Sequence, residues 1–251
     1  MITDEESSEK PEAIRGSDGD AGAAPDEEGE AAAFTSAAST TIRRVYWAEL
    51  VFAAALGAYA VLAVLAHRYA YFGWDVELSR TIQSIDLPGF RTAMIGISRL
   101  GSGWLPVALV VASGTALVVA RRRIEGLTLM AGAGLGSALD RLLKALTARP
   151  RPDGGIVQVA VSTHYESFPS GHVLFFIEFF GFLFFLSYLL LKPGGLRRAS
   201  FVVLGSLIAV IGVSRVYLGA HWPSDVVGAY LAGGMWLMLM IEAYRRLKTR
   251  L

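Results

Sequence analysis

The sequence predicts an all-α fold: a six-span transmembrane helix bundle with short interfacial helices and a disordered N-terminal tail. Hydrophobic residues make up 53% of the 251 residues and charged residues only 18%, whereas about a quarter of a typical soluble domain is charged. Six apolar stretches approach the length of about 20 residues that a helix needs to cross a bilayer. No stretch alternates like a barrel strand, so the spans are helices that satisfy their own backbone hydrogen bonds.

Residues 1–40 are predicted to be the disordered tail, and residues 41–251 the transmembrane domain. The tail holds 11 Asp and Glu against Lys10 and Arg15, with Phe34 as its single aromatic residue. Such a composition buries too little apolar surface to offset the entropy of ordering the chain. It also lacks the basic start and apolar run of a signal peptide. A solvated tail without chemistry is favoured over a regulatory or partner-binding one.

The apolar stretches place the six spans at residues 45–66, 104–121, 124–146, 171–191, 199–219 and 223–244. Residues 67–103 are mixed, with Leu78, Ile82 and Ile85 at helical spacing, which predicts short helices at the membrane interface. Gly132 and Gly136 form a G-x-x-x-G pattern, which favours close packing inside the bundle over a dimer contact. The oligomeric state stays open.

The distribution of basic residues predicts the orientation. Twelve cations fall on the side that holds both termini, among them the run Arg121–Arg123 and the C-terminal cluster that ends at Arg250. Cytoplasmic loops carry the excess of Lys and Arg in membrane proteins. We therefore expect a multi-pass protein of the cell membrane with both termini in the cytoplasm.

Polar residues gather at the opposite, outer ends of four consecutive spans. Charges in a membrane span are costly, so such a cluster indicates a functional site. Three members of the cluster are the cations Lys144, Arg151 and Arg215, and fewer carboxylates than cations lie near them in the sequence. Together they would bind a doubly charged oxyanion such as phosphate. Ser170 and Gly171 follow a proline at the start of a span, where helix amides would face the same anion.

Two histidines complete the cluster. His221 precedes Asp225 by four residues, so one helical turn would bring the carboxylate beneath the ring, fix its tautomer and leave the other nitrogen free as a nucleophile. His172 has no such partner in the sequence and is better placed to carry a proton to a leaving oxygen.

The spacing of these residues resembles the three-part signature of the type 2 phosphatidic acid phosphatase and vanadium haloperoxidase superfamily. The three parts are Lys144 with Arg151-Pro152, then Pro169-Ser170-Gly171-His172, and finally Ser214-Arg215 with His221 and Asp225. The resemblance implies that His221 attacks phosphorus to form a phosphohistidine, with Asp225 orienting it and His172 protonating the leaving oxygen. Lys144, Arg151, Ser170, Gly171 and Arg215 would hold the phosphoryl oxygens.

The resemblance further implies a lipid phosphatase whose site opens on the non-cytoplasmic face and whose substrate enters sideways from the bilayer. Undecaprenyl diphosphate, phosphatidylglycerophosphate and phosphatidic acid are the candidate substrates, with the first ranked highest on resemblance alone. No metal is expected, because the cations supply the countercharge to the phosphate. No other cofactor and no nucleic-acid partner is expected either. Bulky residues from Val173 to Phe176 depart from the small ones of many relatives and leave the width of the pocket open.

Several alternatives stay open. A non-catalytic lipid-binding or lipid-moving protein is the main one, while a haloperoxidase and a serine hydrolase built on Ser170 are less favoured. Asp140 either positions Lys144 or pairs with Arg141. Glu178 lies inside a span and is read as a buried partner for an inward-facing arginine or as a protonated packing residue, rather than as a proton relay. Arg149 is read as a loop cation rather than an extra phosphate ligand. His164 and Glu166 are read as exposed loop residues rather than as contacts of a headgroup.

Overall fold

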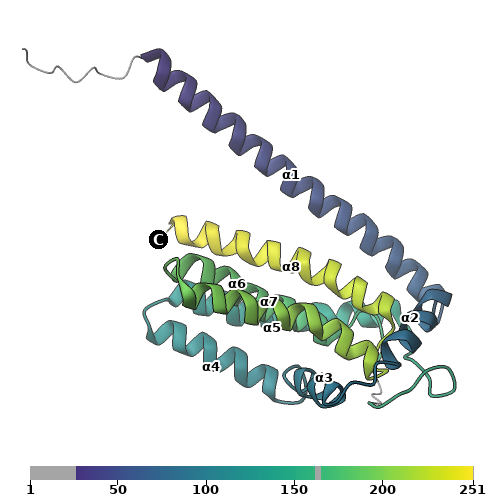
Figure 1. Ribbon diagram of the computed structural model, residues 1–251. Helices are drawn as coiled ribbons and strands as arrows, with labels where there is room; N and C mark the ends of the chain where they lie inside the picture. The colour runs from purple at the N-terminus through teal and green to yellow at the C-terminus, as the bar shows by residue number, and fades with distance from the viewer. Residues whose placement is uncertain (1–26, 162–164, 251) are drawn as a thin grey trace, which may run out of the picture. The chain divides into compact units, whose positions relative to one another are not determined.

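The computed structural model describes residues 27–161 and 165–250, and every regular element in them is a helix (Figure 1). The chain divides into two compact units, residues 1–48 and 49–251. The helices in chain order are α1 (Glu27–Arg68), α2 (Gly73–Gln83), α3 (Phe90–Arg99), α4 (Leu105–Val119), α5 (Arg123–Thr147), α6 (Gly171–Leu190), α7 (Gly195–Tyr217) and α8 (Pro223–Arg250). The all-α prediction is therefore confirmed for the described residues.

In the part of the chain that the structure describes, four helical segments are long and apolar enough to cross a membrane: Tyr46–Arg68 within α1, and the helices α6, α7 and α8. α4 is apolar but has only 15 residues, which is about 22 Å of helix. α5 has 25 residues but carries charges near both ends, including Glu125 and Lys144. The membrane class is confirmed, while the count of six spans is not.

The predicted tail overlaps the start of α1. α1 begins at Glu27, and residues 1–26 lie outside the described part. The first residues of α1 are rich in alanine, which has the highest helix propensity. The division into a disordered tail and a transmembrane domain stays a prediction.

Helix α6 is the centre of the bundle formed by residues 49–250. It packs against α5, α7 and α8, while α4 pairs with α5 (Figure 1). Its buried aromatic residues, such as Phe176, Phe179 and Phe182, form the core together with residues from the neighbouring helices. Because α6 is surrounded on several sides, it needs apolar residues around most of its circumference, and beyond its first turn its sequence is hydrophobic apart from a few residues such as Glu178.

Helices α4 to α8 run up and down, so the site-bearing ends of all five meet at one end of the bundle. This end holds the start of α4, the end of α5, the start of α6, the end of α7 and the start of α8 (Figure 1). The predicted short helices within residues 67–103 are α2 and α3, and both pack against α7. The convergence of helix ends predicted for the site is therefore present.

The G-x-x-x-G pattern of α5 packs inside the bundle, as favoured from the sequence. A Cβ atom on Gly132 would lie 2.2 Å from the side chain of Met240 on α8, and one on Gly136 would lie 2.2 Å from Oε1 of Glu178 on α6. Each glycine thus allows another helix to approach α5 closely.

Candidate active site

Six of the eight predicted site residues line one cavity of about 1060 Å³ at the site-bearing end of the bundle: Lys144, Arg151, Gly171, His172, Arg215 and His221. They come from α5, the loop after it, α6, α7 and the turn before α8. The other two, Ser170 and Asp225, are fully buried directly behind this wall. The structure therefore brings the predicted residues together, although they span 82 positions of the chain.

His221 presents one ring nitrogen to the cavity side and the other to the protein interior. Nδ1 lies 2.8 Å from the carbonyl oxygen of Ser167, so it carries the proton and donates it. Nε2 lies 3.3 Å from Nη1 of Arg151 and therefore accepts. Burial and the nearby cations Arg151, Arg215 and Lys144 hold the pKa of His221 well below 6.5, so the imidazole is neutral and Nε2 keeps its lone pair.

The carboxylate of Asp225 lies beneath the ring of His221 but is not its direct hydrogen-bond partner. Oδ2 lies 3.6 Å from Nδ1 of the histidine, and it accepts from Ser167 Oγ at 2.5 Å and from the Trp222 amide at 2.8 Å. Ser167 therefore joins both residues, through its carbonyl to the ring and through its hydroxyl to the carboxylate. No pattern in the sequence indicated this role for Ser167.

Arg149 lies in the loop after α5, and its side chain is buried there. Only 1% of its surface is exposed, and its guanidinium forms ion pairs with Asp225 at 2.6 Å and with Asp75 of α2 at 2.9 Å. It also donates to Ser224 Oγ at 2.6 Å. The arginine therefore ties α2 to the start of α8 from behind the site. Its burial follows from two carboxylates far away in sequence, which loop position alone does not reveal.

Three backbone carbonyls hold the guanidinium of Arg151. Nε donates to Tyr165 at 2.6 Å, Nη1 to Ala220 at 2.7 Å and Nη2 to Glu166 at 3.3 Å. The side chain is consequently fixed beside His221, where its charge faces the cavity. Partial burial lowers the pKa of Arg151 from its ordinary value, but an arginine stays charged at neutral pH.

The side chains of the other two cations have one partner each among the described residues. Lys144 forms an ion pair with Asp140 one turn earlier on α5, so the sequence alternative in which Asp140 positions this lysine is the one present. Arg215 is buried and donates from Nη1 to Ser98 Oγ of α3 at 2.5 Å. Its Nε has no hydrogen-bond partner among residues 27–161 and 165–250. That donor is available to an oxyanion in the cavity.

The start of α6 adds backbone amides and two side chains. The first amides of a helix have no partner within it, so this end attracts anions. Ser170 is buried, and its Oγ has no partner in the described residues. A Cβ on Gly171 would lie 2.8 Å from Asp140 Oδ2 and 3.0 Å from Lys144 Nζ, so a larger residue would displace the ends of these two side chains. The bulky Val173 and Phe176 point into the core rather than into the cavity.

His172 has a partner that sequence reasoning missed. Its Nε2 lies 2.9 Å from Oγ of Ser102, in the turn after α3. The same hydroxyl donates to the carbonyl of Ser98 at 2.9 Å, so it accepts the proton of Nε2. Ser98 and Ser102 thus link α3 to both Arg215 and His172. Their spacing of four residues on a helix was the only available signal, and it is too common to have been decisive.

The cavity has a polar end and an apolar end. Beyond the cations, its walls are formed by Pro106 and three valines of α4, by small residues of α5, and by Leu174 and Phe175 of α6. Glu178 lines this deeper part. Glu166 is exposed, as predicted, whereas His164 lies outside the described residues. The shape suits an amphipathic ligand with an anionic head and an apolar chain.

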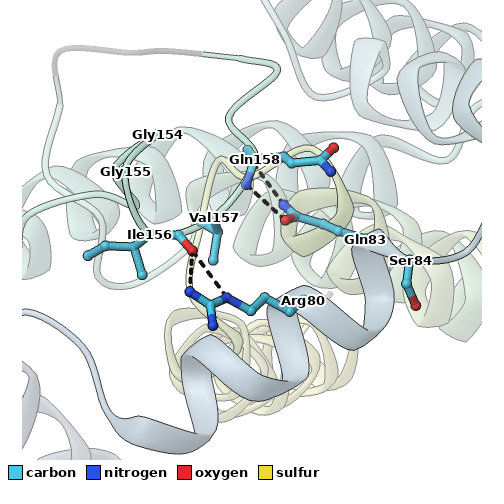
Figure 2. Close-up of a pocket in the computed structure, with 8 residues that line it drawn as sticks. All are labelled: Arg80, Gln83, Ser84, Gly154, Gly155, Ile156, Val157 and Gln158. Carbon is cyan, nitrogen blue, oxygen red and sulfur yellow. Dashed lines mark hydrogen bonds between the residues drawn. The ribbon is translucent and has the colours of Figure 1, made fainter.

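A smaller hollow of about 390 Å³ lies between α2 and the loop that follows Arg151 (Figure 2). Nε and Nη2 of Arg80 donate to the carbonyl of Ile156 at 3.2 and 3.0 Å. Gln83 exchanges two hydrogen bonds with the backbone of Gln158, at 2.8 and 3.0 Å. These contacts fasten the loop to α2, and with it the backbone next to Arg151.

This chain is similar to one protein family and to several known lipid phosphatases. The model of the PAP2 superfamily matches residues 125–248. Phosphatidylglycerophosphatase B of Bacillus subtilis is 28% identical over 190 residues, which cover 74% of this chain and 90% of the relative. Decaprenylphosphoryl-5-phosphoribose phosphatase of Mycobacterium tuberculosis is 34% identical over 158 residues, or 61% of this chain and 80% of the relative.

The fold also resembles a solved structure. A crystal structure of a transmembrane PAP2 type phosphatidylglycerolphosphate phosphatase from Bacillus subtilis superposes with a TM-score of 0.68 at 26% identity. The match covers 78% of this chain and 96% of that one. The matched family region contains every residue of the predicted site.

Proposed function

Because the chain belongs to the PAP2 superfamily, we propose that it is an integral-membrane lipid phosphatase that hydrolyses a lipid phosphate or diphosphate monoester. The observation that carries the proposal is the cavity itself, in which Lys144, Arg151 and Arg215 surround a neutral histidine at the polar end of an otherwise apolar space. Cations placed around a phosphoryl group stabilise the charge that spreads over its oxygens during transfer.

The first step is attack by His221 on phosphorus. Its Nε2 lone pair forms the P–N bond while the P–O bond to the lipid breaks. The leaving oxygen takes a proton from Nδ1 of His172, whose Nε2 proton stays with Ser102 Oγ. The proton on Nδ1 stays with the Ser167 carbonyl, which keeps the ring in the reactive tautomer. Asp225 supports this arrangement through Ser167 and stabilises the positive charge that forms on the ring.

The second step is hydrolysis of the phosphohistidine. His172, now without its proton, removes a proton from water, the oxygen attacks phosphorus and the P–N bond breaks. Inorganic phosphate leaves, and both histidines return to their starting states. Throughout, the phosphoryl oxygens contact the three cations, Ser170 and the amide of Gly171.

The apolar part of the cavity supports entry of the substrate from the bilayer. Its walls from α4, α5 and α6 would contact the chain of the lipid, while the phosphate reaches the cations. Phosphatidylglycerophosphate, phosphatidic acid and undecaprenyl diphosphate remain the candidate substrates. The similarity to phosphatidylglycerophosphatase B adds support for the first, and the similarity to a decaprenyl lipid phosphatase supports a polyprenyl lipid.

We propose six membrane spans, with α4 and α5 added to the four long apolar segments, and with the site on the non-cytoplasmic side. Three basic segments support this orientation, since the turns before α5 and α7 and the end of α8 all lie away from the site (Figure 1).

Single introduced cysteines can test the orientation, because the chain has no cysteine of its own. In intact cells, an impermeant maleimide should label Gly154→Cys and spare Gly195→Cys. Both glycines are exposed, and a Cβ on either meets no atom within 4 Å. The reverse labelling would invert the proposed orientation.

Phosphate release by the purified protein tests the catalytic proposal. The panel contains the three candidate lipids and p-nitrophenyl phosphate as a soluble ester. His221→Asn should abolish release while the protein still inserts and elutes as a folded species. His67→Asn is the matched control, because His67 lies outside the cavity and bonds to the Thr147 carbonyl. Unchanged release by the His221 variant would end the proposed mechanism.

A further inference from the structure

Glu178 is a buried carboxyl group that the proposed mechanism does not use. Only 2% of its surface is exposed, and it lies two turns inside α6. Its Oε1 has no hydrogen-bond partner among residues 27–161 and 165–250, and no cation of these residues forms an ion pair with it. Of the two roles favoured from the sequence, a partner for an inward-facing arginine has no counterpart among these residues, and a protonated packing residue does not account for the unpaired oxygen.

Glu178 lines the same cavity as the phosphate-binding residues and lies on the same face of α6 as Gly171. Gly171, Leu174, Phe175 and Glu178 all line the cavity, and their spacing places them on one face of α6. Seven residues separate Gly171 from Glu178, so the carboxyl lies about 10 Å further along the helix. A lipid whose phosphate reaches Gly171 would pass Glu178 with the part of the molecule next to its headgroup.

The surroundings leave room for the carboxyl but, within the described residues, give its Oε1 no hydrogen-bond partner. On α5, a Cβ at Gly136 would lie 2.2 Å from Oε1 and 2.3 Å from Oε2, so the glycine makes space for the group. The α4 side of the same cavity presents Val107, Val110 and Val111. An uncompensated carboxyl in such surroundings is held as the neutral acid, which is both a donor and an acceptor. A buried polar group without a partner is costly, which favours a ligand that supplies one.

We propose that Glu178 donates a hydrogen bond to an ester carbonyl of the lipid substrate, and that it thereby makes the cavity select glycerolipid phosphates over polyprenyl diphosphates. This inference rests on the proposed phosphatase function and names its substrate class. The ester groups of a glycerolipid lie next to the phosphate, whereas a polyprenyl chain carries only hydrocarbon there. A polyprenyl lipid would leave the carboxyl unpaired against its chain.

Two lipids that differ only in these carbonyls give a sharp test. Dioleoyl phosphatidic acid has ester linkages, and its dialkyl analogue has ether linkages with the same charge and nearly the same chain length. We expect the wild-type protein to show a kcat/KM about fivefold higher for the ester lipid, the effect of one net hydrogen bond. Glu178→Leu should bring the ratio close to one, and Glu178→Gln, which keeps an N–H donor, should preserve most of it.

Each outcome bears on a different claim. A wild-type ratio of one, or an unchanged ratio in Glu178→Leu, would overturn the role of Glu178 even if both lipids are hydrolysed. Absence of wild-type activity on every lipid phosphate would instead contradict the proposed function. The wild-type ratio needs no variant, so the inference stays testable if the leucine protein does not fold. The rates of each variant are normalised to its rate on p-nitrophenyl phosphate, which lacks a glycerol backbone. Glu178→Leu should also raise the rate on undecaprenyl diphosphate relative to the rate on phosphatidic acid.

Discussion

Arg149 and Asp225 form an ion pair that is closed to solvent, with 2.6 Å between Nη1 of the arginine and Oδ1 of the carboxylate. The same guanidinium pairs with Asp75. Removing one partner of a buried pair leaves the other charge uncompensated, at a cost of about 3–5 kcal/mol. Arg149→Ala should therefore lower the melting temperature in detergent strongly.

Arg91→Ala is the control for this experiment. Arg91 is exposed on α3, and a surface substitution of this kind changes stability by less than about 0.5 kcal/mol. Equal melting temperatures for the two variants would show that the Arg149 ion pairs contribute no net stability.

Ser102 is expected to act as a positioning residue for His172. Its hydroxyl accepts from Nε2 of the imidazole, so Ser102→Ala removes the contact that orients the ring. We expect kcat to fall about fivefold with little change in KM, because the hydrogen bond does not involve the lipid. Ser102→Thr keeps the hydroxyl and should restore most of the rate. Ser84→Ala, which removes an exposed hydroxyl outside the main cavity, is the control. A rise in KM alone would show that Ser102 acts on substrate binding instead.

The pH dependence of the reaction should reflect the lowered pKa of His221. Protonation removes the Nε2 lone pair, so activity is lost as the pH falls through this pKa. Since burial and neighbouring cations hold the pKa below 6.5, the acid limb of kcat/KM should have its midpoint below pH 6.5. Arg151→Gln removes one of these cations, which makes protonation easier, so the residual activity should show an acid limb at higher pH. A shift in the opposite direction would contradict this account of the histidine.

The convergence of the site was predictable because it depends on where each helix ends. Hydropathy locates the ends of α5, α6 and α7 to within a few residues, and an up-and-down bundle brings alternate ends together. The residues that support the site were not predictable in this way. Arg149 meets Asp75, and His172 meets Ser102, across more than 65 positions of sequence. Such pairs depend on how α2 and α3 pack against the bundle, which no local pattern encodes.

Vanadate should inhibit the enzyme, and EDTA should leave its activity unchanged. Vanadate adopts the five-coordinate geometry of phosphoryl transfer, and the cavity offers it three cations. Arg215→Ala removes one of these cations and its unpaired Nε donor, so vanadate should bind at least about tenfold more weakly to this variant, as expected for a charged hydrogen bond. Inhibition constants measured with p-nitrophenyl phosphate provide the comparison. Loss of activity in EDTA that Mg²⁺ or Zn²⁺ restores would contradict catalysis by the protein cations alone.

Two glycines of α8 should respond in opposite ways to the same substitution. A Cβ on Gly228 would lie 2.4 Å from the ring of Phe168, which is fully buried against Tyr59 at a centroid distance of 5.6 Å. Because this ring has no room to move, Gly228→Ala should destabilise the protein by about 1–3 kcal/mol. It should also reduce activity, since Phe168 follows directly after Ser167, the partner of His221.

A Cβ on Gly234 meets no atom of the described residues within 4 Å, and alanine stabilises a helix by up to about 1 kcal/mol relative to glycine. Gly234→Ala should therefore melt at the wild-type temperature or above it, and a matching loss of stability in both variants would contradict the packing described for Phe168.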